Sequence, residues 1–90
     1  MFFINIIKKQ NKLLIFHVIV IILFSIINFL VSKKYGNNED KENFKNYSDT
    51  FYYTTITHFT IGFGDISPRS RTMKMISVLH AFVAFSLMNL

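Results

Sequence analysis

Residues 13–31 read LLIFHVIVIILFSIINFLV, nineteen consecutive residues without a charged side chain. As a helix this stretch is about 28 Å long, close to the roughly 30 Å of hydrocarbon in a bilayer. Isoleucine and valine weaken helices in water, but in lipid a helix satisfies every backbone hydrogen bond within one segment. We therefore expect a transmembrane helix over 13–31. A cleaved signal peptide is the competing interpretation, but the apolar run is too long and no small-residue cleavage site follows it.

A second apolar run lies near the end of the sequence. Residues 75–90, MISVLHAFVAFSLMNL, carry no charge, and the run reaches nineteen residues if it begins at 72 and Lys74 extends its amine toward the lipid headgroups. We expect a second transmembrane helix over residues 72–90. Small side chains recur in it at helical spacing and would let another helix approach closely in lipid; they are Ser77, Ala81 and Ala84.

The polar segments on either side of the first run differ in character. Residues 1–12 combine three lysines with Phe and Ile residues, as an amphipathic segment at a membrane interface does. Residues 32–47 contain four lysines, three acidic residues and a turn signal at Gly36. We expect the first segment to lie along the membrane surface and the second to be a solvated loop.

Residues 48–65 change character midway. Ser48 can cap a helix and Asp49 favours its positive end, which predicts a helix of about eleven residues, roughly 16 Å and too short to cross a bilayer. The run Thr60-Ile61-Gly62-Phe63-Gly64-Asp65 alternates glycine with bulky residues and cannot continue that helix. Together they predict a re-entrant loop, which is tolerated at membrane depth only where protein buries it or it lines an aqueous path. Residues 66–71 then lead to the second run.

Composition and charge exclude several classes of function. The 90 residues contain no cysteine, which excludes a disulfide framework and a cysteine–zinc site. The net charge of +5 is spread over three polar segments, which argues against a soluble nucleic-acid module. All five acidic residues lie in polar segments and no catalytic triad is present, so we do not expect an enzyme. A phosphate-binding Gly-x-Gly loop is disfavoured, because the third glycine and the preceding apolar strand are missing.

The six residues from Thr60 to Asp65 resemble the selectivity-filter signature of potassium channels. The order of helix, loop, short helix, filter and helix is similar to the miniature two-span channels of algal viruses, over nearly the whole chain. The resemblance implies an all-α membrane protein in which two transmembrane helices flank a re-entrant pore helix and filter. It implies a homotetramer that conducts K⁺ without a cofactor, a small-molecule substrate or a nucleic acid. It also implies that 32–47 and 66–71 are extracellular, that both termini are cytoplasmic, and that the protein lies in a host cell or virion membrane.

The resemblance assigns roles to residues of this loop. The ion sites would be the backbone carbonyls of Thr60, Ile61, Gly62 and Phe63. Carbonyls that converge on one axis require some positive φ angles, which Gly62 and Gly64 allow. The side chains of Ile61 and Phe63 would wedge the loop against the short helix. Residues expected to support the filter are Gly64, Asp65, His58, Tyr52 and Tyr53.

Two positions depart from patterns found in the family. Phe63 stands where tyrosine is commonest, so a hydroxyl bond to the surrounding helix is missing. Ile56 stands where some relatives carry a carboxylate behind the filter, so Asp65 has no acid partner there. Tyr52 and Tyr53 are expected to pack as an aromatic cuff, and Asp65 is expected to be structural more than ion-binding.

Three histidines lie in or beside apolar segments. A polar residue inside a membrane is a functional candidate by default. For His17 and His80, in the two apolar runs, a neutral imidazole hydrogen-bonded between helices is the simpler interpretation. His58 directly precedes the filter and is expected to support it. No two of them have metal-ligand spacing.

Charge and resemblance disagree on orientation. Residues 1–12 carry three basic residues and residues 32–74 carry seven, so the positive-inside rule alone would place the second region in the cytoplasm. We follow the resemblance, because lysines on an amphipathic segment suit the anionic lipids of the cytoplasmic leaflet.

Phe82 and Phe85 are candidates for an inner gate. They are three residues apart and near one helix face, so four copies would form a hydrophobic ring narrow enough to dewet. The alternative is that both pack against lipid or the first span. For the whole chain, the alternative function is a small two-span structural or accessory membrane protein without a pore. The glycines at 62 and 64 separate the two functions, because a protein without a pore has no use for them.

Overall fold

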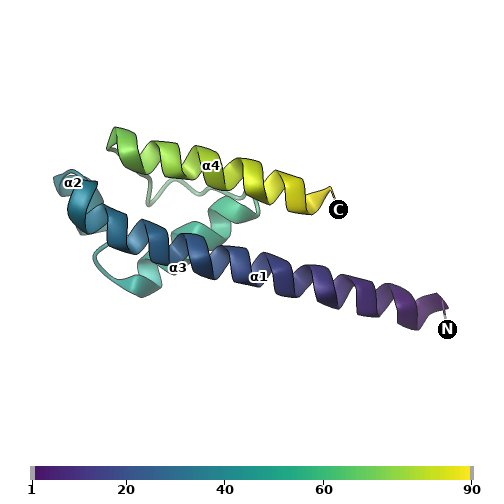
Figure 1. Cartoon of the computed structure of the whole chain (residues 1–90). Helices are drawn as coiled ribbons and strands as arrows, with labels where there is room; N and C mark the ends of the chain where they lie inside the picture. The colour runs from purple at the N-terminus through teal and green to yellow at the C-terminus, as the bar shows by residue number, and fades with distance from the viewer. Residues whose placement is uncertain (1, 90) are drawn as a thin grey trace.

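The computed structural model describes the backbone of residues 2–89 and the side chains of residue 4 and residues 12–89. Within that part of the chain every regular element is a helix, so the expected all-α class is confirmed there. The helices are α1 (Phe2–Tyr35), α2 (Asn38–Asn43), α3 (Tyr47–His58) and α4 (Arg71–Met88). In Figure 1, α1 and α4 run side by side, α2 lies at one end, and the start of α1 and the end of α4 lie toward the other end.

α1 is longer than the predicted span. It joins the predicted segments 1–12 and 13–31 in one continuous helix and extends through Tyr35. The portion Lys12–Tyr35 is long and apolar enough to cross a membrane, and among the helices described it is the one that meets both conditions. Its last turn contains two lysines, which are tolerated because cations are stabilising at a helix C-terminus and long stems can snorkel.

The interfacial segment 1–12 stays a prediction. It depends on apolar side chains that lie outside the described side chains of the structure, namely Phe2, Phe3, Ile6 and Ile7.

The connection after α1 is folded, and the expectation that it is solvated throughout is wrong. Asn37 caps α2: its side chain accepts from the Asp40 N–H at 2.9 Å, and the Asp40 carboxylate accepts from the Asn37 N–H at 3.2 Å. The backbone of Gly36, just before this cap, passes close to Asp40: a Cβ on Gly36 would lie 2.7 Å from the Cβ of Asp40. Asp40 and Phe44 are completely buried. The segment is folded because its own polar side chains, Asn37 and Asp40, make the capping hydrogen bonds of a helix.

Asp40 fastens α2 to the start of α4. Its Oδ1 accepts from the Arg69 N–H at 2.7 Å and its Oδ2 from the Ser70 N–H at 2.9 Å. Ser70 in turn caps α4 by accepting from the Met73 N–H at 3.3 Å. Burial would raise the pKa of Asp40, but these N–H groups and that of Asn37 outweigh burial and lower the pKa. The carboxylate is therefore ionised at neutral pH and joins two distant segments.

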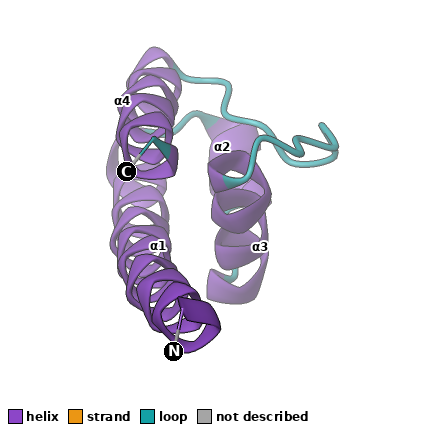
Figure 2. Cartoon of the chain, turned by 90° about the vertical axis from the view of Figure 1, so that its right-hand side faces the viewer, coloured by secondary structure: helices purple, strands orange, loops and turns teal. Residues whose placement is uncertain are grey.

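Hydrogen bonds join α3 to both long helices. Toward α1, Asn28 Nδ2 donates to Thr54 Oγ1 at 3.1 Å, between two buried side chains. Toward α4, the Tyr53 hydroxyl and Ser77 Oγ are 2.7 Å apart. In Figure 2, α3 lies beside the pair formed by α1 and α4. Polar contacts of this kind hold helices together where lipid removes the hydrophobic driving force.

The buried apolar core is small. Its buried cluster consists of Phe44, Tyr53 and Met73, and the rings of Phe44 and Tyr53 meet edge to face at 5.1 Å. The other buried apolar side chains among the described residues are Ile21, Phe24, Ile56 and Ala84. Elsewhere α1 and α4 expose large apolar side chains such as Leu14 and Phe82. Faces this apolar require lipid or other chains to cover them.

Candidate functional site

The loop that follows α3 is held at its base by backbone hydrogen bonds. α3 ends at His58, with Phe59 as its C-cap. The N–H groups of Ile61 and Gly62 both reach back to the carbonyl of Ile56, at 2.8 and 3.3 Å. A helix C-terminus leaves its last four carbonyls without intrahelical partners. The loop therefore satisfies the end of the helix, and the helix fixes the start of the loop.

Every second residue of the loop has a positive φ angle. The angles are 60° at Thr60, 56° at Gly62 and 83° at Gly64, whereas the residues between them have none. The two glycines behave as the sequence leads us to expect. Thr60 was not foreseen, and a left-handed backbone costs a residue with a Cβ about 1–2 kcal/mol. Strain of this kind persists where the surrounding structure imposes it.

The bulky side chains that alternate with the loop glycines are largely uncovered within one chain. Ile61 is 53% exposed and Phe63 is 70% exposed. A Cβ built on Gly62 or Gly64 would meet no atom within 4 Å. The expectation that Ile61 and Phe63 wedge the loop against the short helix stays a prediction, since within one chain both side chains are largely exposed. The glycines are needed for their φ angles and not because the chain crowds them.

A second attachment joins the far end of the loop to α3. The Tyr52 hydroxyl donates to the Asp65 carboxylate, at 3.0 Å to Oδ2 and 3.2 Å to Oδ1. Partial burial, together with the hydrogen bond and charge of Asp65, raises the pKa of Tyr52, so the phenol remains a donor at neutral pH. Two residues expected to support the filter are thus in direct contact.

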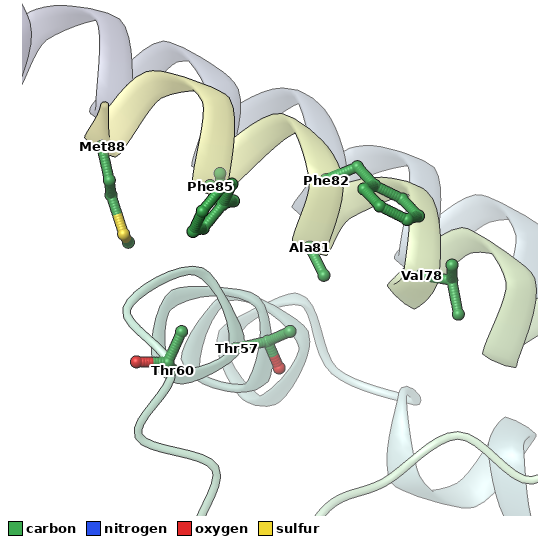
Figure 3. A pocket seen from close by; sticks show the side chains of 8 residues that line it. Thr57, Thr60, Val78, Ala81, Phe82, Phe85 and Met88 are labelled. Atoms are coloured by element: carbon green, nitrogen blue, oxygen red, sulfur yellow. The ribbon is translucent and has the colours of Figure 1, made fainter. Parts of the chain in front are cut away.

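A pocket of about 420 Å³ lies between the end of α3 and the C-terminal half of α4 (Figure 3). Phe82 and Phe85 line it from α4 and are each 69% exposed, so neither packs against α1. Thr57 and Thr60 line it from the α3 side, and Figure 3 shows Phe85 directed toward them. The candidate gate residues and the first filter residue therefore border one apolar space.

The comparison with known proteins identifies the family. Residues 13–90 match a family described as "Ion channel". The chain belongs to the ion channel family. It is therefore a membrane protein and not an enzyme, and the resemblance to pore-loop potassium channels is confirmed at the level of the family.

Two curated relatives of this ion channel are potassium channels by name. Over 52 residues it is 36% identical to "Potassium channel K2" of Plasmodium falciparum (isolate 3D7), which covers 53% of this chain and 4% of that protein. Over 48 residues it is 35% identical to "Potassium channel protein kcv" of Paramecium bursaria Chlorella virus 1, covering 53% of this chain and 49% of that one. The matches thus span at most about half of either relative. No solved structure matches the chain.

The three histidines of this ion channel form a connected chain. His17 Nδ1 lies 2.8 Å from His58 Nε2, and His58 Nδ1 lies 3.0 Å from His80 Nε2. The interhelical hydrogen bonds expected at His17 and His80 are present, but sequence gave no sign that His58 joins them. The rings are separated by 41 and 22 residues, so no spacing motif links them. Among the described residues, no three His, Cys, Asp or Glu side chains are arranged to hold a metal ion.

Tyr53 does not take part in a cuff around the filter of this channel. Its ring packs on Phe44 and its hydroxyl contacts Ser77, so within one chain it fixes α3 to α4. Only Tyr52, of the two tyrosines, reaches the filter loop within this chain.

Proposed function

We propose that this chain is a subunit of a potassium-selective channel whose ion sites are the backbone carbonyls of four residues, Thr60, Ile61, Gly62 and Phe63. The observation that carries the proposal is the alternation of positive φ angles at Thr60, Gly62 and Gly64. Alternation of backbone hand lets successive carbonyls turn toward one axis, where they replace the hydration shell of K⁺ in the manner established for potassium-channel filters. Potassium is the permeant ligand, and the mechanism requires no cofactor.

The pore requires four copies of the chain. A single extended strand cannot surround an ion, whereas four strands supply a ring of carbonyls at each site. The exposure of Ile61 and Phe63 supports this assembly, because their side chains need cover that the chain itself does not provide. The unoccupied space around Gly62 and Gly64 is equally consistent with neighbours placed there by symmetry.

In the membrane, α4 acts as the second span and α3 enters part-way. α4 has Arg71 and Lys74 at its start, which places these cations at the interface where their stems can snorkel. The start of α1 and the end of α4 lie toward the same end of the molecule, which supports both termini being cytoplasmic and α2 extracellular (Figure 1). The host cell or virion membrane is the proposed location. This orientation still runs against the basic-residue count.

The end of α3 and the pocket form the inner part of the pore. A helix C-terminus carries partial negative charge, and the end of α3 at His58 borders the pocket through Thr57. That charge favours a cation in the cavity beneath the filter. Phe82 and Phe85 would close this cavity as a hydrophobic ring that dewets when the four copies converge.

The experiment is a planar bilayer recording on purified protein with potassium on one side and sodium on the other. We expect a reversal potential near that of potassium, and Gly62→Ala protein as the matched control should give no selective current. Equal permeability to the two ions contradicts the filter assignment. Stable membrane insertion with no current at all favours the alternative of an accessory protein without a pore.

A further inference from the structure

One side chain from each of three helices meets at the base of the filter loop. His17 of α1, His58 of α3 and His80 of α4 are linked ring to ring, at 2.8 and 3.0 Å. His58 is 0% exposed and His80 is 1% exposed. His58 is also the last residue of α3, whose final turn holds the filter loop through the Ile56 carbonyl. A change in this contact therefore acts directly on the start of the filter.

The hydrogen bonds, together with the buried Nδ1 of His80, determine which nitrogen of each ring carries the proton. A neutral imidazole has one donor and one acceptor nitrogen, and His58 uses both. His80 Nδ1 is buried and has no hydrogen-bond partner among the described residues. A buried N–H without an acceptor is the rarer and costlier defect, so the proton of His80 belongs on Nε2, from which it donates to His58. His58 then carries its own proton on Nε2 and donates to His17 Nδ1.

The three hydrogen-bonded histidines cannot take up a further proton without losing a contact or burying an unpaired N–H. A proton on the Nδ1 of His58 or His17 would turn an acceptor into a donor that faces another N–H. His80 Nδ1 is the remaining lone pair, and a proton there would be buried without an acceptor. A proton added in acid therefore breaks at least one hydrogen bond between the histidines, or leaves a buried N–H without an acceptor.

The C-terminus of α3 carries a partial negative charge that favours a proton on His58, but no acidic side chain among the described residues is bonded to the three rings. Phe24 stacks on the His80 ring at 4.4 Å, and Phe59 meets the His58 ring edge to face at 5.1 Å. The nearest charged side chains along the described part of each helix are exposed, and they are Lys12 on α1, Asp49 on α3 and Lys74 on α4. By the standard helix rise they lie about 8, 13 and 9 Å along the axes from their histidines. Two are cations, which oppose protonation, and none is bonded to the rings.

We propose that His17, His58 and His80 form a neutral, directional hydrogen-bonded chain that positions the base of the filter, and that protonation of this chain closes the channel. The proposal rests on the potassium-channel function proposed above. The histidines are positioning residues, because their rings act on the filter through the last turn of α3 and not by contact with the ion. The channel is thereby sensitive to acid at the base of its own filter.

The test is single-channel recording of the reconstituted full chain in potassium, from about pH 8 down to about pH 4.5, a range on both sides of the ordinary pKa of histidine. We expect the open probability of the wild type to fall at least several-fold on acidification, with potassium selectivity unchanged while the channel is open. His80→Gln should conduct and lose this acid closure, because an amide can donate to neutral His58 and, after rotating, accept from protonated His58. His80→Leu keeps a similar volume but cannot donate, so its open probability should be low at every pH. Asp49→Asn, the matched control in α3, should close in acid as the wild type does.

Nitrogen-15 magnetic resonance of histidine-labelled protein in lipid provides the second readout. We expect all three rings to be neutral with the proton on Nε2 near neutral pH. A His80 proton on Nδ1, or a charged ring at that pH, contradicts the proposed hydrogen-bonded chain of neutral histidines. A wild type whose open probability does not change with pH, or identical behaviour of His80→Gln and His80→Leu, overturns the positioning role. Protein that never carries selective potassium current contradicts the proposed function instead, and the spectra then decide the hydrogen-bonded chain independently.

Discussion

The buried face of α3 and the loop that follows α3 differ in how fully the rest of the chain covers them. Along α3, Thr50, Thr54 and His58 are fully buried, and each has a hydrogen-bond partner. In the loop, Ile61 and Phe63 are mostly exposed and the two glycines face open space. The single chain therefore contains a complete scaffold and an incomplete site. The comparison teaches that substitutions in the two regions should separate assembly from selectivity.

The largest expected effect is on current and comes from the loop. Gly64→Ala should abolish selective potassium current while the protein still inserts and assembles, because a Cβ at positive φ costs about 1–2 kcal/mol in each of the four copies that share one pore. The measurement is bilayer current together with native mass. The matched control is Gly36→Ala in the scaffold, where the new Cβ would crowd Asp40, so it should lower thermal stability and leave selectivity intact. Selective current from Gly64→Ala protein would contradict the separation of assembly from selectivity.

The largest expected effect on stability comes from Asp40. Asp40→Ala leaves the backbone N–H groups of Arg69 and Ser70 without their acceptor and should lower the free energy of unfolding by about 3 kcal/mol. Asp40→Asn retains an acceptor oxygen and should lose less. Thermal unfolding in detergent measures both. Unchanged stability of the alanine variant would show that α2 is not part of the scaffold.

Phe85→Ala tests whether the pocket contains a gate. Removing the ring should lengthen openings several-fold at unchanged potassium selectivity, because a wider apolar constriction stays wet. Met75→Ala, at an exposed position of α4 outside this pocket, serves as the control and should leave dwell times alone. If neither Phe85→Ala nor Phe82→Ala changes the open and closed times, the filter itself is the gate.

Acid should weaken the scaffold through Asp40. The pKa of Asp40 is lower in the folded chain than its ordinary value of 3.8, so the folded state binds fewer protons. Its contribution to stability is complete above that value and is lost as the pH falls through the lowered pKa. Thermal unfolding in detergent should therefore show a loss below about pH 4 that is shallower in Asp40→Asn. An equal acid loss in the two proteins would assign it to other groups.

The smallest expected effect is at Tyr52. Tyr52→Phe removes the hydroxyl that donates to Asp65 at an exposed site, so we expect a small loss in the stability of the conducting filter, seen as slightly shorter bursts of openings. Tyr35→Phe is the control, since Tyr35 is an exposed tyrosine at the end of α1. Bursts of wild-type length would show that Asp65 is held by something other than Tyr52.

The parts of the fold that sequence predicts are those with local causes. The apolar run 13–31 needs only its length and composition to be assigned as a helix, and Gly62 and Gly64 signal positive φ because glycine alone adopts it freely. Ser70, by contrast, caps a helix whose exact start the sequence left open, and Asn37 caps α2, a helix that the sequence did not predict. Local rules predicted the three longer helices and their order, and the structure added α2 and the helix ends.

The features that sequence missed depend on contacts between distant residues. Asp40 looks like one acid among several in a polar loop, and its burial follows only from backbone N–H groups about thirty residues away. The histidine chain likewise requires three helices to be placed before the rings meet. The positive φ of Thr60 is imposed by the hydrogen bonds of Ile61 and Gly62 to Ile56, which no residue preference at 60 reveals.

The most direct test of the central claim is to mix wild-type chains with Gly64→Ala chains in equal amounts and record selective potassium current. If four loops build one filter, only assemblies of four wild-type chains conduct, and current should fall to about one sixteenth of the wild-type value for random assembly. Labelled chains would verify equal incorporation. Current that falls to one half, in proportion to the amount of wild-type chain, would mean that each chain conducts alone and would contradict a filter shared by four copies.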